Sequence, residues 1–385
     1  MNSPKATRLF IDVILLIVLI IKLISLGHEN ADTVVYIQWY NQLSTEGFSR
    51  MADNFSVYTP PYLYLLWMAT LTKEVVPPLI AIKLIPTIFD LLSAFGIYKL
   101  IRLKYPQGDI PFLAAAGFLL LPTVMVNSTY WGQVDSPYAS FLLLCIFFLL
   151  SDHPLYAMLI FDITFSIKTQ TVFLVPFLLI LAWKKRIPWT YFLIPAVVYL
   201  IMIVPAVLAG MPFIDALSIY VSQANAFGAP SMNAPNLYSL VIYPPYYMDW
   251  ETSIRIGSII AAISITSWVV VYARKQYELT QKVMILSMLT SLTLVPYILP
   301  KMHDRYFYPA DALSYVFAFY YPAYWFIPLL FQAASGIMYY VFLGSVDPIR
   351  FNILFPAAAA FSTIALVILL VKQYHETSRT EESLG

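Results

Sequence analysis

Two polar islands interrupt an otherwise apolar chain, at residues 130–136 (YWGQVDS) and 301–309 (KMHDRYFYP). Ionisable side chains at the ends of membrane helices are costly to desolvate, so a cluster of them is a functional-site candidate. The second island holds the densest run of charge, in His303, Asp304 and Arg305. An arginine fork suits phosphate oxygens, and a histidine can donate a hydrogen bond or titrate. This run favours a phosphate site, with a weak Asp304–Arg305 surface pair as the alternative.

The first island combines an aromatic ring, an amide and a carboxylate in Trp131, Gln133 and Asp135. A pyranose needs this combination, because its CH groups pack on an aromatic face and its hydroxyls bond to amides and carboxylates. Two other interpretations stay open. Asp135, followed by Pro137, could cap a helix, and Trp131 could belong to the aromatic belt of a membrane interface.

Asp32 follows the first apolar run, at the expected start of a surface helix. The apolar residues after it recur at helical spacing: Val35, Tyr36, Trp39, Tyr40 and Leu43. An aspartate at a helix start is a common N-cap, so capping stays an alternative to a chemical role.

Lys168 stands in a polar interruption (SIKTQ) between two apolar runs. A lysine there can simply snorkel to water. The orientation derived below nevertheless puts it on the outer side, where it is no topology signal, and this suggests an anionic ligand.

A long polar stretch at residues 210–253 holds Asn233 and Asn236, followed by an aromatic run at residues 243–247. Asn and Pro are ordinary turn formers, so these residues alone predict an ordered loop. The aromatic density adds the hypothesis of a lid or a sugar-contacting wall.

The elements that must position these side chains are membrane helices. The chain has 385 residues, of which 60% are hydrophobic and 11% charged, with a mean hydropathy of +0.75. This composition is typical of a polytopic membrane protein. The net charge of +1 offers no basic excess for nucleic acid. Cys145 is the single cysteine, so no intramolecular disulfide forms. No zinc-type spacing, P-loop, dinucleotide fingerprint or nucleophile elbow is present in the sequence.

A bilayer crossing needs about 20 apolar residues, and the chain offers about twelve candidate segments. They are residues 8–26, 79–101, 110–126, 137–151, 155–167, 170–183, 189–209, 254–273, 283–299, 307–321, 323–343 and 351–371. We expect an all-α polytopic helical bundle with a single transmembrane domain at residues 1–371. A cytoplasmic tail at residues 372–385 follows, and we expect residues 375–385 of it to be disordered.

Basic residues set the orientation, because short cytoplasmic loops carry an excess of Lys and Arg. With a cytoplasmic N-terminus, and with residues 60–74 kept as a shallow or re-entrant helix, every basic cluster faces the cytoplasm. The clusters lie at residues 102–104, 184–186, 274–282 and 372. The outer face then holds a first loop at residues 27–78 with short amphipathic helices, a second loop at residues 210–253, and both polar islands. We therefore expect a catalytic pocket on the outer side.

Taken in order, the motifs resemble those of the GT-C superfamily of polytopic glycosyltransferases. The nearest resemblance is to bacterial and archaeal proteins similar to the mannosyltransferase that adds the second mannose of GPI anchors. It covers nearly the whole chain, about residues 8–370. The motifs are Asp32 and residues 58–67 (YTPPYLYLLW), 131–136 (WGQVDS), 168–170 (KTQ), 233–236 (NAPN) and 303–309 (HDRYFYP). Two departures are Asp304, where the family often has Glu, and Thr169, where it often has Pro.

The resemblance implies a polyprenyl-phosphate-linked hexose as donor, with mannose the first candidate, and an inverting transfer on the outer face. Asp32 would be the general base and Asp135 the reserve base. Lys168, His303 and Arg305 would hold the donor phosphate.

The remaining substrate-binding residues that it implies are Tyr58, Trp131, Gln133, Gln170, Asn233, Asn236, Asp304 and Tyr306. The loop with Asn233 and Asn236 would close over the pocket. The acceptor would be a hydroxyl of a glycolipid, polysaccharide or protein. No cofactor is required and no metal site is assigned, although a divalent cation stays open. The expected location is a prokaryotic plasma membrane, with membrane lipids as the surroundings.

Two other classes stay open. About twelve crossings with sparse charge also describe secondary transporters, although these place substrate residues near the bilayer midplane and often contain internal repeats. A flippase for lipid-linked sugars is the other alternative. Neither would form a glycosidic bond.

Overall fold

The structure is a computed structural model that describes residues 4–225, 228–241, 249–344 and 348–382. About 80% of the described residues are helical, which confirms the all-α prediction in its coarse form. Within those ranges one short parallel sheet is the exception, in which β1 (Ser231–Met232) pairs with β2 (Met302–His303). The chain forms two compact units. Unit 1 comprises Met1–Thr169 and Phe192–Ala226, and unit 2 comprises Gln170–Tyr191 and Phe227–Gly385.

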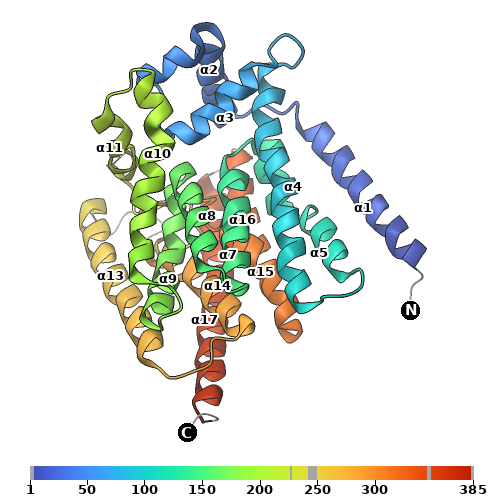
Figure 1. The fold of residues 1–385 in the computed structure, drawn as a ribbon, viewed down its shortest axis with the longest axis vertical. Helices are drawn as coiled ribbons and strands as arrows, with labels where there is room; N and C mark the ends of the chain where they lie inside the picture. The colour runs from blue at the N-terminus through green and yellow to red at the C-terminus, as the bar shows by residue number, and fades with distance from the viewer. Residues whose placement is uncertain (1–3, 226–227, 242–248, 345–347, 383–385) are drawn as a thin grey trace. The chain divides into compact units, whose positions relative to one another are not determined.

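Unit 1 is built around α4, α7 and α8, which lie side by side (Figure 1). Its helices are α1 (Pro4–Ser25), α2 (Ala31–Glu46), η1 (Gly47–Ala52), α3 (Pro60–Thr70), α4 (Pro78–Lys104), α5 (Ile110–Phe118), α6 (Pro122–Met125), the π-helical η2 (Val126–Trp131), α7 (Asp135–Leu150), α8 (Pro154–Ile167), α10 (Ile194–Leu208) and α11 (Phe213–Asn225). Helix α4 begins with proline, whose missing N–H is not needed at the first position, and ends with Arg102 and Lys104, whose positive charges suit the C-terminal end of the helix dipole.

Residues 27–78, the predicted first loop, contain the short helices α2, η1 and α3. Helix α2 buries Tyr36, Trp39, Tyr40 and Leu43, whereas Val35 stays 40% exposed and so does not belong to the buried stripe. Helix α3 has 11 residues. At about 1.5 Å per residue it is far shorter than the ~30 Å of a bilayer core, so residues 60–70 do not cross as a helix.

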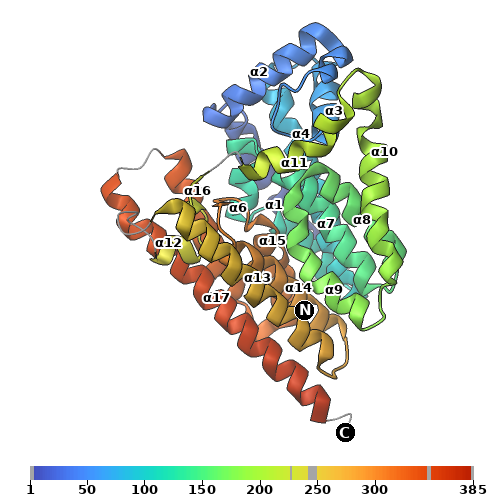
Figure 2. The same cartoon turned by 90° about the vertical axis from the view of Figure 1, so that its left-hand side faces the viewer.

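Unit 2 is a second helical body, in which α13, α14 and α17 run side by side (Figure 2). Its elements are α9 (Val175–Trp183), α12 (Leu237–Val241), α13 (Trp250–Arg274), α14 (Gln281–Ile298), α15 (Tyr308–Tyr320), η5 (Pro322–Tyr324), α16 (Ile327–Leu343) and α17 (Pro348–Glu382), with β1 and β2. Two short helices, η3 (Thr169–Leu174) and η4 (Trp189–Leu193), stand where the chain passes between the units.

The expected disordered tail is wrong for most of its length, because α17 continues to Glu382. Its polar residues find partners in unit 2. Gln373 accepts a hydrogen bond from the indole of Trp268 at 3.1 Å and donates to Ser287 at 2.8 Å. These bonds remove the cost of burying an amide, and the helix therefore extends past the last apolar residue.

Six helices of the described residues are long and apolar enough to span a membrane, or seven if one bent pair counts as a single span. They include α4, α13 and α14. Large apolar side chains on their surfaces are exposed, such as Ile201 and Ile263 at 62% each, as expected of lipid-facing positions. The expected count of about twelve crossings is not confirmed. Several of the predicted segments are apolar but shorter, with 16 residues in α7 and 14 in α8.

Candidate functional site

Asp32 lies in the first turn of α2, and it is not the cap of that helix. The cap is Asn30, whose side chain accepts hydrogen bonds from the backbone amides of Asp32 and Thr33, both at 3.1 Å. In return, the Thr33 hydroxyl accepts a hydrogen bond from the backbone N–H of Asn30 at 2.8 Å, which completes a capping box. The capping interpretation of Asp32 is therefore wrong, and its carboxylate is left available for other contacts.

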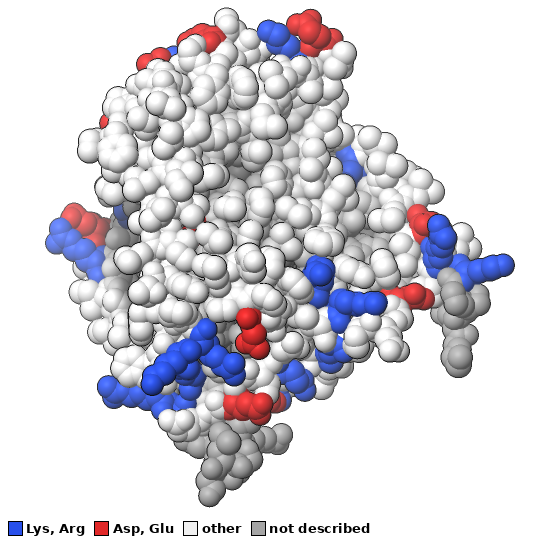
Figure 3. Space-filling view, in the orientation of Figure 1, with Lys and Arg blue, Asp and Glu red and all other residues white. Residues whose placement is uncertain are grey.

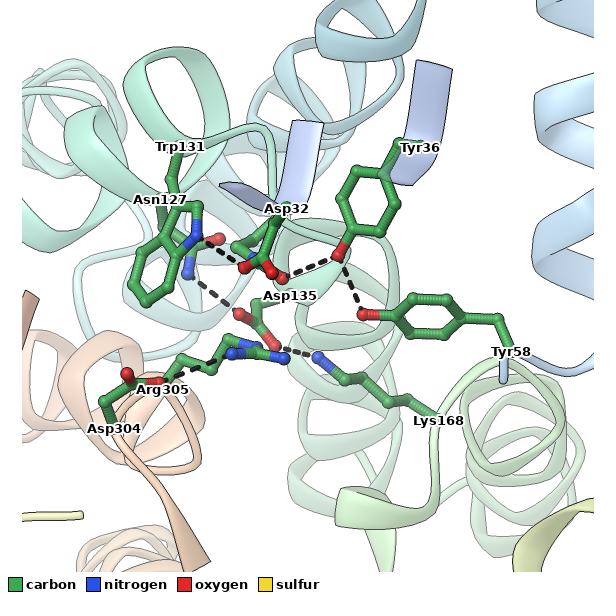
Figure 4. A network of polar contacts seen from close by, with 10 residues as sticks. Asp32, Tyr36, Tyr58, Asn127, Trp131, Asp135, Lys168, Asp304 and Arg305 are labelled. Atoms are coloured by element: carbon green, nitrogen blue, oxygen red, sulfur yellow. Dashed lines mark hydrogen bonds and ion pairs between the residues drawn. The ribbon is translucent and has the colours of Figure 1, made fainter. Parts of the chain in front are cut away.

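The Asp32 carboxylate faces the first polar island (Figure 4). Its Oδ2 accepts from the indole Nε1 of Trp131 at 2.8 Å and from the Nε2 of Gln133. Its Oδ1 has no hydrogen-bond partner in the part of the chain that the structure describes, and the residue is partly exposed. One oxygen is thus fixed by two neutral donors while the other is open.

The turn that carries Trp131 and Gln133 depends on a glycine. It leaves the π-helical turn η2 through Gly132, which has a positive φ of 82°. A Cβ at this position would lie 3.2 Å from both the Cγ of Lys83 and the Cγ2 of Thr33. Glycine therefore serves both the left-handed backbone and the close approach of α2 and α4. Single π-helical turns are frequent at functional sites.

Lys83 fixes the two segments that build the site. Its ammonium, fully buried at the start of α4, donates to the carbonyl oxygens of Tyr130 at 2.9 Å, Ser25 at 3.3 Å and His28. The His28 ring stacks on Tyr130 with centroids 3.8 Å apart. Burial, and next the charge of Lys83, lower the pKa of His28, which favours the neutral ring. The backbones before Asp32 and Trp131 are thereby held together.

Asp135 is bound differently, although it also lies in a first helical turn. It is fully buried, accepts from Nδ2 of Asn127 at 2.8 Å, and forms an ion pair with Lys168. Lys168 is 6% exposed and lies 5.2 Å from the ring centre of Tyr138. Both oxygens of Asp135 are engaged, so this carboxylate is unsuited to take a proton and the reserve role as base is not favoured.

Tyrosine hydroxyls extend the Asp32 site toward a cavity. Tyr36 donates to Oε1 of Gln133 at 3.1 Å and lies 3.0 Å from the hydroxyl of Tyr58. The Tyr58 ring packs edge-on against Trp39, with centroids 5.7 Å apart. Trp39 lines a cavity of about 430 Å³ between residues 54–57 and α11. Its polar lining comes from Asn54, Ser56, Ser222 and Gln223.

In unit 2 the second polar island pairs with the segment of Asn233. Met232 faces His303 in the small sheet, Asn233 bridges His303, and the Asp304 amide donates to the Met232 carbonyl at 3.0 Å. Asn233 has a positive φ of 63°, a conformation that asparagine tolerates. These two motifs, about 70 residues apart in sequence, thus share one backbone framework. The closure of this loop over a ligand stays a prediction.

One ion pair and two ring contacts involve the side chains of the island. Its guanidinium lies 3.4 Å from Oδ1 of Asp304, which is only 1% exposed. The His303 and Tyr306 rings lie 5.0 Å apart, and Tyr306 lies 6.2 Å from Phe173. The Asp304–Arg305 pair is therefore largely buried, unlike the surface pair considered as the alternative.

Two predicted amides of unit 2 have unmet hydrogen-bonding capacity. Asn236 accepts from the Ser239 amide at 3.3 Å as it leads into α12, but its Nδ2 has no partner among the described residues. The Oε1 of Gln170 is likewise buried without one. A buried amide atom that lacks a partner costs about 1–3 kcal/mol, and a bound hydroxyl would remove this cost.

The structure therefore brings the predicted residues together in two groups. Asp32, Trp131, Gln133, Asp135 and Lys168 are linked within unit 1, with Tyr58 reached through Tyr36. The second group lies within unit 2 and contains Asn233, His303, Asp304, Arg305 and Tyr306. The expected convergence of Lys168 with His303 and Arg305 stays a prediction.

Sequence reasoning missed four residues of the unit 1 site: Asn30, Tyr36 as a hydrogen-bonding group, Lys83 and Asn127. The Asn30–Thr33 spacing is a capping signal that could have been recognised. Lys83 and also Lys22 are charges inside apolar segments, which mark special positions by default. Lys22 indeed forms a buried 2.5 Å pair with Asp90. Asn127 has no comparable signal.

In the regions that the structure describes, no group of three or more His, Cys, Asp or Glu side chains is placed to hold a metal ion. The question of a divalent cation is left to experiment.

No protein-family model matches this sequence, and no curated protein is significantly similar to it.

Proposed function

We propose that this protein is a membrane glycosyltransferase of the GT-C type, which transfers a hexose from a polyprenyl-phosphate donor to an acceptor hydroxyl with inversion. The observation that carries the proposal is the state of Asp32. Two N–H donors hold one carboxylate oxygen, while the other is open on a partly exposed residue. A general base needs this arrangement, because it must be oriented and still accept a proton.

The proposed step is a single displacement at the anomeric carbon. The acceptor oxygen attacks C1 of the sugar as its proton passes to Oδ1 of Asp32. The bond between C1 and the phosphate oxygen breaks, and polyprenyl phosphate leaves with the electron pair. Attack opposite the leaving group inverts the configuration at C1. Trp131 and Gln133 keep the base oriented throughout.

The acceptor has a proposed route to this base. The cavity beside Trp39 is lined by indole, amide and hydroxyl groups, which suit a sugar-like acceptor. It is linked to Asp32 through Tyr58, Tyr36 and Gln133. We assign Tyr58 to the acceptor side.

We assign the donor phosphate to His303 and Arg305, with Asp304 orienting the guanidinium. A cationic fork stabilises the charge that develops on a leaving phosphate. Because the ammonium of Lys168 is paired with Asp135, we give it a positioning role within the site rather than a phosphate contact. Asn233 and Asn236 would contact the donor from the same framework, and mannose remains the first candidate sugar.

A transfer assay tests the proposal. The purified full chain is incubated with radiolabelled polyprenyl-phosphate mannose and octyl mannoside as a simple acceptor, and labelled disaccharide is measured. We expect product with the wild type and with Glu46→Gln, which changes a carboxylate at the far end of α2. Asp32→Asn should bind donor and form no product. Full activity of Asp32→Asn would remove Asp32 from the mechanism, and active wild type with a different donor sugar would revise only the substrate.

A carrier of lipid-linked sugars is the second candidate, favoured by ionisable groups inside the helices. Lys22 and Asp90 pair within the bundle of unit 1. Asp162 of α8 is buried, and neither of its carboxylate oxygens has a partner among the described residues. Movement of a fluorescent polyprenyl-phosphate sugar across proteoliposomes, without a new glycosidic bond, would favour this candidate.

A further inference from the structure

A basic pocket lies where α9 and α13 end in unit 2, and it contains none of the residues of the Asp32 and His303 groups. It has a volume of about 410 Å³ and is lined by Lys184, Lys185, Arg186 and Arg274, with one acid, Glu278. Four cations and one carboxylate leave three positive charges around one concave space. In Figure 3, Lys and Arg side chains gather at the end of the face where α9 and α13 end in Figure 1. Such a pocket attracts an anion.

An apolar groove leads away from this pocket along the same two helices. It has a volume of about 260 Å³ and an almost purely apolar lining that includes Trp183, Trp189, Val269 and Val270. The pocket and the groove share Trp183, Ala273 and Arg274, so they are continuous. Trp183 and Trp189 are 56% and 55% exposed, which is the position of aromatic side chains at a membrane interface.

The pocket is held by contacts between its two walls. The ammonium of Lys184 donates to the carbonyl oxygen of Lys275 at 2.6 Å and lies 4.0 Å from the ring centre of Tyr277. Tyr277 is buried. The segment after α9 is thereby fixed to the segment after α13, and binding does not require these segments to be ordered first.

We propose that this pocket and groove bind one anionic phospholipid, with the phosphate headgroup among Lys185, Arg186 and Arg274 and one acyl chain in the groove. The charge selects an anion, and the groove selects an anion that carries a hydrocarbon chain. Basic pockets between membrane helices bind anionic headgroups in this way. The proposal does not depend on glycosyl transfer, because no residue of the pocket belongs to the Asp32 or His303 groups.

The test measures lipid affinity for the purified full chain by native mass spectrometry, with phosphatidylglycerol and phosphatidylcholine as probes. We expect tighter binding of phosphatidylglycerol. Each Lys or Arg near a headgroup contributes about 1 kcal/mol, which is about fivefold. The double variant Lys185→Gln/Arg274→Gln should therefore bind phosphatidylglycerol roughly 25-fold more weakly, with phosphatidylcholine unchanged. Arg102→Gln/Lys104→Gln, at the end of α4, is the matched control and should have no effect.

A second pair of measurements separates a lipid from a free anion. Val270→Trp fills the groove at a position that is 39% exposed, and it should weaken phosphatidylglycerol binding without affecting inorganic phosphate. Millimolar phosphate should not displace the lipid. If the double variant is not monodisperse, Arg274→Gln alone should give about a fivefold loss. Equal binding of the two lipids, no effect of the charge variants, or displacement by phosphate would overturn the proposal.

Discussion

Two aspartates lie in the first turns of two helices of the same unit, and their surroundings bind them in opposite ways. Asp32 in α2 is partly exposed and is held through one oxygen by the neutral N–H groups of Trp131 and Gln133. Asp135 in α7 is fully buried and has both oxygens engaged, by the ammonium of Lys168 and the amide of Asn127. The Asp32 carboxylate is oriented and keeps one oxygen available to accept a proton, whereas the Asp135 carboxylate is paired with a cation and has both oxygens engaged.

The difference shows that position on a helix does not decide the role of a carboxylate. Each residue lies in a first turn, where the helix dipole favours negative charge. Their neighbours separate them, since a buried ion pair leaves no site for a proton whereas a single fixed oxygen does. The comparison predicts that Asp32 carries activity and Asp135 carries stability.

The largest expected effect is the loss of catalysis in Asp32→Asn. Removing a general base costs about 10²- to 10⁴-fold in rate. The neutral amide should leave the fold intact, because Asp32 is partly exposed. Transfer rates measured alongside thermal unfolding check both halves of this expectation. A destabilised Asp32→Asn protein would show that the carboxylate is structural.

The second effect is on stability, in Asp135→Asn. It leaves the Lys168 ammonium buried without its counter-charge, which costs about 3–5 kcal/mol. Asp135→Asn/Lys168→Met removes both charges and should recover most of this loss. The buried Cys145 is the only cysteine of the chain, so labelling by a thiol-reactive dye on heating reports unfolding. A stable but inactive Asp135→Asn would instead return Asp135 to the mechanism.

A smaller effect is expected for Trp131→Phe, which keeps an aromatic ring and removes the N–H that holds Asp32. A hydrogen bond to a charged group contributes about 1.5–3 kcal/mol. We therefore expect transfer to fall by about 10- to 100-fold at saturating donor. Trp67→Phe is the matched control, because the indole N–H of Trp67 has no hydrogen bond among the described residues. Equal losses in both variants would mean that only packing matters.

The smallest effect separates the two functions of Asn30. Asn30→Ala removes the cap of α2 and the 2.9 Å bond from Nδ2 to the Trp131 carbonyl. Asn30→Ser keeps a cap and removes only the Nδ2 bonds, to the carbonyls of Trp131 and, at 3.4 Å, Tyr130. We expect a loss of about 1 kcal/mol from the missing cap, visible as the difference in unfolding temperature between the two variants. Identical unfolding temperatures would contradict the capping box.

Much of this site could be predicted from sequence because its residues stand at helix ends, where polarity interrupts apolar runs. Asp32, Trp131, Gln133, Asp135 and Lys168 were all found in this way, and the structure links them. Their partners were not predictable, because a pairing such as Asp135 with Lys168 depends on how α7 and α8 pack. Residue type and position alone left both residues open to several roles.

The fold, too, has features that the sequence predicts and features that depend on how the helices pack. Apolar composition predicts helices and the membrane, and the Pro60–Pro61 start predicts the short helix α3. Apolar composition does not fix the number of membrane crossings, because α7 and α8 are apolar but short. The tail was predicted wrongly because its polar residues suggested solvent, whereas Gln373 bonds to Trp268 and Ser287 across the packed helices of unit 2.

The contacts of Lys83 determine when the Asp32 site can form during synthesis of the chain. Its three carbonyl acceptors come from Ser25, His28 and Tyr130, so they span more than one hundred positions of the chain. During synthesis, Asp32 is inserted long before the ammonium that braces its loop and longer still before Trp131 and Gln133. The Asp32 group therefore matures only after the chain has been made through residue 133. A nascent or truncated chain that stops earlier carries the Asp32 carboxylate without the two N–H groups that orient it, so the order of synthesis itself delays the formation of this site.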